Sequence, residues 1–190
     1  MGPSPTTRER RLWIATALAL TAIYASIPFA GSLAAFLRAN GLLAPAFATG
    51  FLLAIVVTIV RAIRHARGPR PLWVALAVVT VWGMLFVRLG VSAEERSHLF
   101  EYGLLALLIH ELLLERRRVD RGGAARPAIL AILATAGFGW VDEGIQGVVP
   151  GRVYDLRDVG VNALAGLVAV ASSAAPGWVT GRRDRGGPRG

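Results

Sequence analysis

The sequence contains no cysteine, which excludes disulfide bonds, thiolate catalysis and cysteine-ligated metals. Lysine is also absent, so all 21 basic residues are arginine, and this usage, with abundant alanine, glycine and valine, is typical of a GC-rich bacterial genome. Acidic residues number only 12 among 190, leaving a formal net charge of +9. Because the arginines flank apolar runs, they indicate membrane topology rather than a nucleic-acid surface, and we expect no nucleic-acid partner.

The apolar content excludes an ordinary soluble globule. Hydrophobic residues make up 54% of the chain, and the mean hydropathy is +0.53. Apolar runs long enough to cross a bilayer recur along the sequence. The first could be a cleaved signal peptide, but it is long for one and no good A-x-A site follows it. The expected membrane spans are residues 12–30, 42–60, 72–90, 98–114, 127–149 and 159–179.

The distribution of arginine predicts the orientation of these spans. The two tails and the loops at 61–71 and 115–126 lie on one side of a six-span protein and hold 16 arginines, against 5 for the other side. The positive-inside rule then places both termini in the cytoplasm. We therefore expect an all-α helical bundle in the bacterial inner membrane. Residues 1–11 form a cytoplasmic tail, 12–180 the membrane domain and 181–190 a disordered cytoplasmic tail.

One polar stretch, Gly139 to Gly166, interrupts the apolar pattern. Charged and amide residues crowd between its hydrophobic flanks, and polar groups beside a membrane indicate function because they are costly without partners. Helical spacing of three or four arranges the polar residues of the last three spans in stripes. These are Glu94, His98, Glu101 and Tyr102; Asp142 and Gln146 with Glu143 at their edge; and Asp155, Asp158 and Asn162. We expect the stripes to face one another at the outer side of the membrane.

A network that only packs the helices together is one interpretation of these stripes. The number of carboxylates argues against it, because packing networks more often use Ser, Thr and Asn. A first functional interpretation is a site for an external polar headgroup, contacted through Arg152, Arg157 and His98. A second is acid–base catalysis, with His98 oriented by Glu101 or Asp142.

A third interpretation, a divalent metal held by His98 and carboxylates, has little support in the sequence. Only one histidine is present in the stripes, and neither HxxxH nor HExxH occurs. We therefore expect no metal and no cofactor. The catalytic candidates are His98, Glu101, Asp142 and Glu143. The ligand-binding candidates are His98, Tyr102, Gln146, Arg152, Asp155, Asp158 and Asn162.

Two segments carry a family resemblance: ERSHLFEYGLL at 95–105 and VDEGIQGVVPGRVYDLRDVGVNALAGLV at 141–168. Together they resemble the VanZ-like family of bacterial membrane proteins, over roughly residues 94–170. That family shows a His and a Tyr at the start of one span, then D-E-x-x-Q, a P-x-R turn and D-V-x-x-N-x-x-G. The matching positions are His98, Tyr102, Asp142, Glu143, Gln146, Pro150, Arg152, Asp158, Asn162 and Gly166.

The resemblance implies an accessory role in the cell envelope, because the family is named for a member linked to resistance to the glycopeptide teicoplanin. We expect this chain to bind or modify a lipid or a cell-wall precursor headgroup, with an influence on glycopeptide susceptibility. The alternatives are an intramembrane acid–base enzyme acting on an envelope lipid, and a small transporter. The bilayer and the headgroup are the expected partners, and the sequence predicts no oligomeric state.

Overall fold

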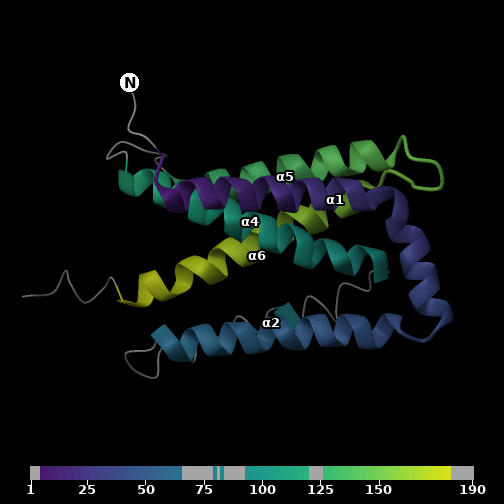
Figure 1. Ribbon diagram of the computed structural model, residues 1–190, viewed down its shortest axis with the longest axis horizontal. Helices are drawn as coiled ribbons and strands as arrows, with labels where there is room; N and C mark the ends of the chain where they lie inside the picture. Colours follow the sequence, from purple (N-terminus) through teal and green to yellow (C-terminus); the bar gives the residue numbers. More distant parts are fainter. Residues whose placement is uncertain (1–4, 66–78, 81, 84–92, 120–125, 181–190) are drawn as a thin grey trace, which may run out of the picture. The chain divides into compact units, whose positions relative to one another are not determined.

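The computed structural model describes residues 5–65, 79–80, 82–83, 93–119 and 126–180, and all regular structure in these ranges is helical. This confirms the all-α prediction. Five labelled helices appear in Figure 1: α1 (Thr7–Ala39), α2 (Leu43–His65), α4 (Ala93–Val119), α5 (Pro127–Gln146) and α6 (Leu156–Thr180).

Three of the described helices are long and apolar enough to cross a membrane. They are α1, the Ser97–Val119 part of α4, and α5. Helix α2 contains a shorter apolar segment, Leu43–Leu53. The span expected at 72–90 lies outside the described residues, apart from positions 79–80 and 82–83. The described chain therefore supports a helical membrane protein with three candidate spans.

Helix α1 is longer than the sequence predicts. The sequence favours a connection from Gly31 to Gly41, but the helix continues to Ala39 and contains Pro28 within it. It ends where Gly41 adopts a φ of +67°. The N–H of Gly41 then donates to the Arg38 carbonyl at 3.1 Å, and the N–H of Leu42 donates to the Leu37 carbonyl at 2.8 Å. This pair of bonds is the Schellman ending that a C′ glycine favours.

The ends of helices α4, α5 and α6 differ from the predicted ends by fewer residues. Helix α4 begins at Ala93, so the acidic connection expected before His98 is already helical. Helix α5 ends at Gln146 rather than near Val149, and α6 begins at Leu156 rather than Val159. The expected tail at 181–190 lies outside the described residues.

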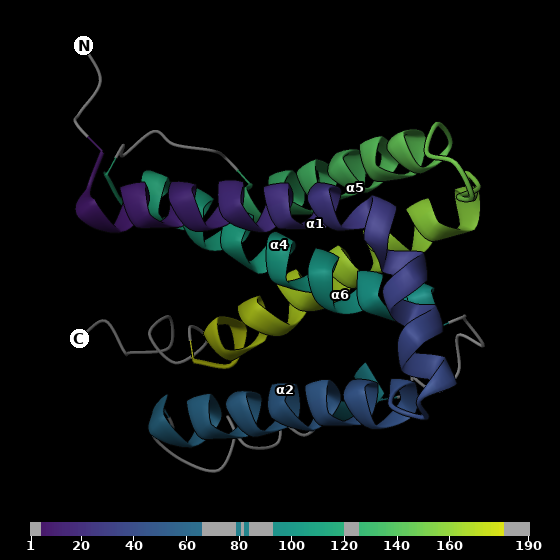
Figure 2. The same cartoon turned by 45° about the vertical axis from the view of Figure 1, so that its right-hand side comes forward.

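The chain divides into two compact units, residues 1–33 with 92–171 and residues 34–91 with 172–190. The first unit holds α4, α5, most of α1 and the first part of α6, which lie side by side in Figures 1 and 2. In this unit the Tyr24 hydroxyl of α1 donates to the Phe138 carbonyl of α5 at 3.0 Å. In the second unit, α2 exposes leucines such as Leu52 and Leu53, each 60% exposed.

Small residues let α5 and α6 approach closely in the first unit. A Cβ added to Gly139 would lie 2.7 Å from the Asn162 Cβ, and one added to Gly166 would lie 3.0 Å from the Thr135 Cγ2. Such small-residue contacts are a common means of packing membrane helices. The core around them is buried and mostly apolar: Leu99, Tyr102, Leu105, Ala106, Ala131, Val161, Ala165, Ala169 and Val170.

Ion pairs join α1 to α4 at the end of this unit remote from the α5–α6 turn. Arg8 donates to Glu111 at 2.7 Å and to Glu115 at 3.2 Å. Glu111, near the inner end of the span expected at 98–114, therefore has a specific partner. A cavity of about 350 Å³ lies at the same end. Its lining residues are Pro5, Glu9, Arg10, Trp13, Ile14, Arg116 and Val119.

Candidate functional site

The turn between α5 and α6 is fixed by local backbone chemistry. After α5 ends, Gly151 adopts a φ of +80°, which glycine tolerates without steric cost, and the N–H of Arg152 donates to the Val149 carbonyl at 3.1 Å. Asp155 then caps α6, because its Oδ1 accepts the N–H of Arg157 at 2.8 Å. The turn therefore returns the chain with Arg152 directed back beside the end of α5.

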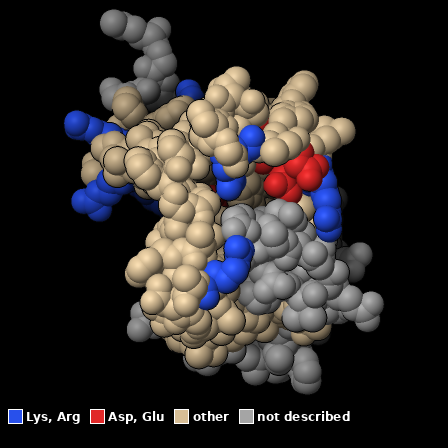
Figure 3. Space-filling view, turned by 90° about the vertical axis from the view of Figure 1, so that its right-hand side faces the viewer, with Lys and Arg blue, Asp and Glu red and all other residues tan. Residues whose placement is uncertain are grey.

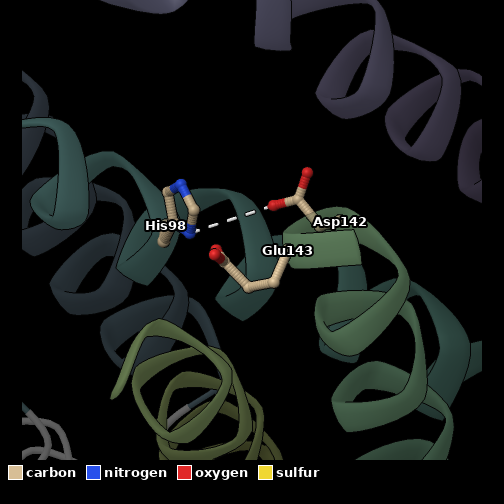
Figure 4. Close-up of side chains that lie close together, drawn as sticks. All are labelled: His98, Asp142 and Glu143. Carbon is tan, nitrogen blue, oxygen red and sulfur yellow. Dashed lines mark ion pairs between the residues drawn. The ribbon is translucent and has the colours of Figure 1, made fainter. Parts of the chain in front are cut away.

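At the centre of the candidate site lie His98 of α4 and two carboxylates of α5. His98 is 6% exposed, Asp142 1% and Glu143 0%. Both carboxylate groups point toward the imidazole ring in Figure 4, and the His98 Nδ1 lies 3.9 Å from the Asp142 Oδ2. One potential ligand atom from each of the three residues lies within 4.8 Å of the others. Two helices therefore bring three titratable groups together in a buried place.

Helix α6 contributes Asn162, which is fully buried. Its Oδ1 lies 3.1 Å from the His98 Nδ1, so a proton on that nitrogen forms a hydrogen bond to the amide oxygen. The close approach of α5 and α6 at Gly139 places the amide beside the imidazole. One residue from each predicted stripe, His98 of α4, Asp142 of α5 and Asn162 of α6, therefore lies in this cluster.

Gln146 connects the carboxylates to Arg152. Its Nε2 donates to the Glu143 Oε1 at 2.9 Å and to the Asp142 Oδ2 at 3.4 Å. Its Oε1 accepts the Arg152 Nε at 3.1 Å and Nη2 at 2.6 Å. The backbone N–H of Asp155 completes the arrangement by donating to the Glu143 Oε2 at 3.2 Å. Within the described part of the chain, Arg152 is thus held through an amide and forms no direct ion pair with either carboxylate.

The site contains buried polar atoms that form no hydrogen bond within it. The Asp142 Oδ1 and the Asn162 Nδ2 are buried and have no hydrogen-bond partner among the described residues. Burying a polar atom without a partner costs about 1–3 kcal/mol, and more when the group is charged. The cluster therefore contains unused capacity to bind a ligand.

Helix α1 also packs against the site, in addition to α4, α5 and α6. The hydroxyls of Tyr24 and Tyr102 both donate to the Phe138 carbonyl, at 3.0 and 3.4 Å. Helix α1 also lines a cavity of about 20 Å³, which has room for about one water-sized group. Its lining residues are Ile23, Ser26, Ile27, Ala30, Ser97, His98, Glu101, Asp142, Gln146 and Arg152. Sequence reasoning missed Tyr24 and Ser26, whose only signal was two polar residues within an apolar run.

The other site residues predicted from the sequence differ in how deeply they are buried. Glu101 is half-buried on the cavity wall, and Tyr102 is fully buried. Asp158 is half-buried in the first turn of α6, whereas Asp155 is exposed and its carboxylate caps the helix. Figure 3 shows acidic side chains gathered near arginines on the face that carries the turn. The stripe's first residue, Glu94, lies on α4, but its side chain falls outside the described part.

Comparison of the chain with protein-family models, curated proteins and solved structures finds no match.

Proposed function

We propose that the chain is a six-span protein of the bacterial cell membrane and belongs to the VanZ-like family, with both termini in the cytoplasm. The three candidate spans among the described helices support a membrane protein, and the excess of arginine on one side of the six-span arrangement supports the orientation. The residues that carry the resemblance also support it, since His98, Asp142 and Asn162 lie together in one cluster. In this orientation the turn from Gly147 to Asp155 faces the outside of the cell.

The function we propose is binding of the polar headgroup of an envelope lipid or a lipid-linked cell-wall precursor. The observation that carries it is the position of Arg152. Arg152 is half-buried and lines the polar cavity, and its guanidinium donates through Nε and Nη2 to Gln146. None of the described hydrogen bonds uses Nη1. A preorganised guanidinium is well suited to phosphate, because charge-assisted bonds to it are short and strong.

A network that served only packing is less consistent with the contacts. Such a network stabilises a bundle when every buried member is satisfied. Here Asp142 and Asn162 each retain one buried polar atom without a described partner. The same headgroup role extends to an influence on glycopeptide susceptibility, because such antibiotics act on envelope precursors outside the membrane.

Lipid binding by the purified protein tests this proposal. Native mass spectrometry in detergent can compare phosphatidylglycerol and a polyprenyl phosphate with phosphatidylcholine as the control lipid. Arg152→Gln removes the charge at the site, and Arg126→Gln removes one at the other end of α5, where Arg126 is exposed. We expect Arg152→Gln to weaken binding of the anionic lipids by roughly tenfold or more, as loss of a charge-assisted hydrogen bond implies. Equal effects of the two substitutions would contradict the proposal.

A second candidate function is acid–base catalysis on the bound lipid. It is favoured by the contact between the His98 Nδ1 and the Asn162 Oδ1 at 3.1 Å. A proton on Nδ1 leaves Nε2 with a free lone pair, which is the form of histidine that acts as a general base. Turnover of a labelled polyprenyl phosphate or phosphatidylglycerol, abolished by His98→Gln, would establish an enzyme. Binding without turnover would establish a receptor for the headgroup.

A further inference from the structure

The donor atoms of the cluster form a mixed nitrogen and oxygen set. His98 supplies an imidazole, and Asp142 and Glu143 supply carboxylates, with their ligand atoms within 4.8 Å of one another. Metal bonds to imidazole and carboxylate are about 2.0–2.2 Å long, so two ligand atoms of one ion lie at most about 4.4 Å apart, and side-chain shifts of a few tenths of an ångström bring these atoms within that limit. The Asn162 Oδ1, at 3.1 Å from the His98 Nδ1, is a further oxygen beside the imidazole ring.

The charge balance of the cluster points to a cation. Asp142 and Glu143 are almost fully buried. Among the described residues, Arg152 reaches them only through Gln146, and the His98 Nδ1 remains 3.9 Å from the Asp142 Oδ2. Buried carboxylates that remain charged require pairing or coordination of a metal, because desolvation of an ion costs several kcal/mol or more. A divalent ion would balance both charges at once.

A second observation, independent of the cluster's composition, indicates a ligand. The Asp142 side chain is 1% exposed and turns its Oδ2 toward the His98 ring in Figure 4, whereas its Oδ1, on the side away from that ring, has no described hydrogen-bond partner. The other three carboxylate oxygens accept hydrogen bonds, since Gln146 donates to the Asp142 Oδ2 and the Glu143 Oε1, and the Asp155 N–H donates to the Glu143 Oε2. Hydrogen bonds of this kind orient the carboxylate ligands of metal sites.

We infer that His98, Asp142 and Glu143 bind a divalent first-row transition metal ion, with the Asn162 amide oxygen beside it. An imidazole with carboxylates suits Mn²⁺, Fe²⁺ or Zn²⁺, whereas Ca²⁺ and Mg²⁺ prefer oxygen alone. The adjoining cavity, of about 20 Å³, has room for one water on the ion. The sequence argues against a metal because it lacks paired histidines, but the histidine and the two carboxylates come from different helices, α4 and α5. The inference goes beyond the proposed headgroup binding, which rests on Arg152.

Metal binding by the full chain tests the inference. The protein is purified in detergent without chelator, and its metal content is measured by inductively coupled plasma mass spectrometry. After treatment with a chelator, it is titrated with Mn²⁺ and Zn²⁺ by equilibrium dialysis. We expect one ion per chain, and a loss of affinity of more than about a hundredfold in Asp142→Asn and in Glu143→Gln. Glu111→Gln is the matched control, because Glu111 pairs with Arg8 elsewhere on α4 and should leave binding unchanged.

Failure to bind either ion stoichiometrically would overturn the inference, as would equal binding by wild type and both cluster variants. If one cluster variant does not fold, the other retains the test, since each removes a different carboxylate. Arg152→Gln distinguishes the two proposals, and we expect it to weaken lipid binding while retaining the metal. Metal binding without lipid binding would uphold the metal site and refute the headgroup function. Lipid binding without metal binding would uphold the headgroup function and refute the metal site.

Discussion

Replacing Asp142 by asparagine should stabilise the metal-free protein. Asparagine has nearly the same shape as aspartate but carries no charge. The side chain it replaces is 1% exposed, lies 3.9 Å from the His98 Nδ1 and accepts a long hydrogen bond, 3.4 Å, from Gln146. A residue selected for ligand binding rather than for packing is expected to reduce stability in the absence of its ligand.

The size of the effect follows from these contacts. Removing the Gln146 contact costs at most about 1 kcal/mol, because the bond is long. Removing the charge relieves the desolvation penalty of a buried carboxylate, which is worth several kcal/mol. No hydrogen bond is lost at Oδ1, because that atom has no described partner in the wild-type protein. The net expectation is a gain of about 1–3 kcal/mol in the free energy of unfolding.

Unfolding of the purified protein in mixed micelles with increasing SDS, in the presence of chelator, measures this change. Asp155→Asn is the control, because Asp155 is exposed and asparagine caps helices as well as aspartate, so stability should change by less than about 0.5 kcal/mol. A loss of about 1 kcal/mol or more in Asp142→Asn would refute the reasoning. It would mean that the carboxylate is a satisfied structural partner.

Three further predictions concern packing, capping and topology. Gly139→Ala places a Cβ 2.7 Å from the Asn162 Cβ and should destabilise the fold by about 1–3 kcal/mol, whereas Gly137→Ala, with nothing within 4 Å, should be neutral or stabilising in the same SDS titration. Equal effects would exclude a tight α5–α6 contact. Asp155→Ala removes the cap of α6 and should cost about 0.5–2 kcal/mol by the same assay; no cost would mean that the cap is unimportant. Cysteine at Val153, which is 81% exposed, should react with an impermeant maleimide applied to intact cells, and reaction only after lysis would refute the N-in, C-in topology.

The polar stripes could be predicted from sequence because they depend only on helical periodicity. His98 and Tyr102 lie on one buried face of α4, and Asp142 and Gln146 lie on one buried face of α5, as a spacing of four requires. Polar side chains avoid lipid, so the faces that carry them meet. The encounter of His98 with Asn162 follows from these two rules.

The contribution of α1 could not be predicted in this way. Tyr24 reaches the Phe138 carbonyl from a helix whose other nearby residues are mostly apolar, and nothing in the sequence indicates which face of α1 packs against α5. The end of α1 could not be predicted either, because the continuation to Ala39 depends on a Schellman turn at Gly41 rather than on hydropathy.

The role of Asp155 and the proposed metal ligands escape sequence reasoning for related reasons. Asp155 belongs to the stripe by spacing, but its position one residue before α6 makes its carboxylate a cap instead of a wall of the site. Metal-binding motifs in sequence depend on ligands close together in the chain. His98 and Asp142 become neighbours only when α4 packs on α5.

The most direct test of the central claim is to locate a bound lipid in living cells. Cells grown with a photoactivatable phosphate-bearing lipid are irradiated, and the cross-linked peptides are identified by mass spectrometry. We expect cross-links on the turn from Gly147 to Asp155, which are lost in Arg152→Gln and retained in Arg126→Gln. Cross-links confined to the 350 Å³ cavity near Trp13, or a turn peptide that Arg152→Gln leaves equally labelled, would contradict the proposed site.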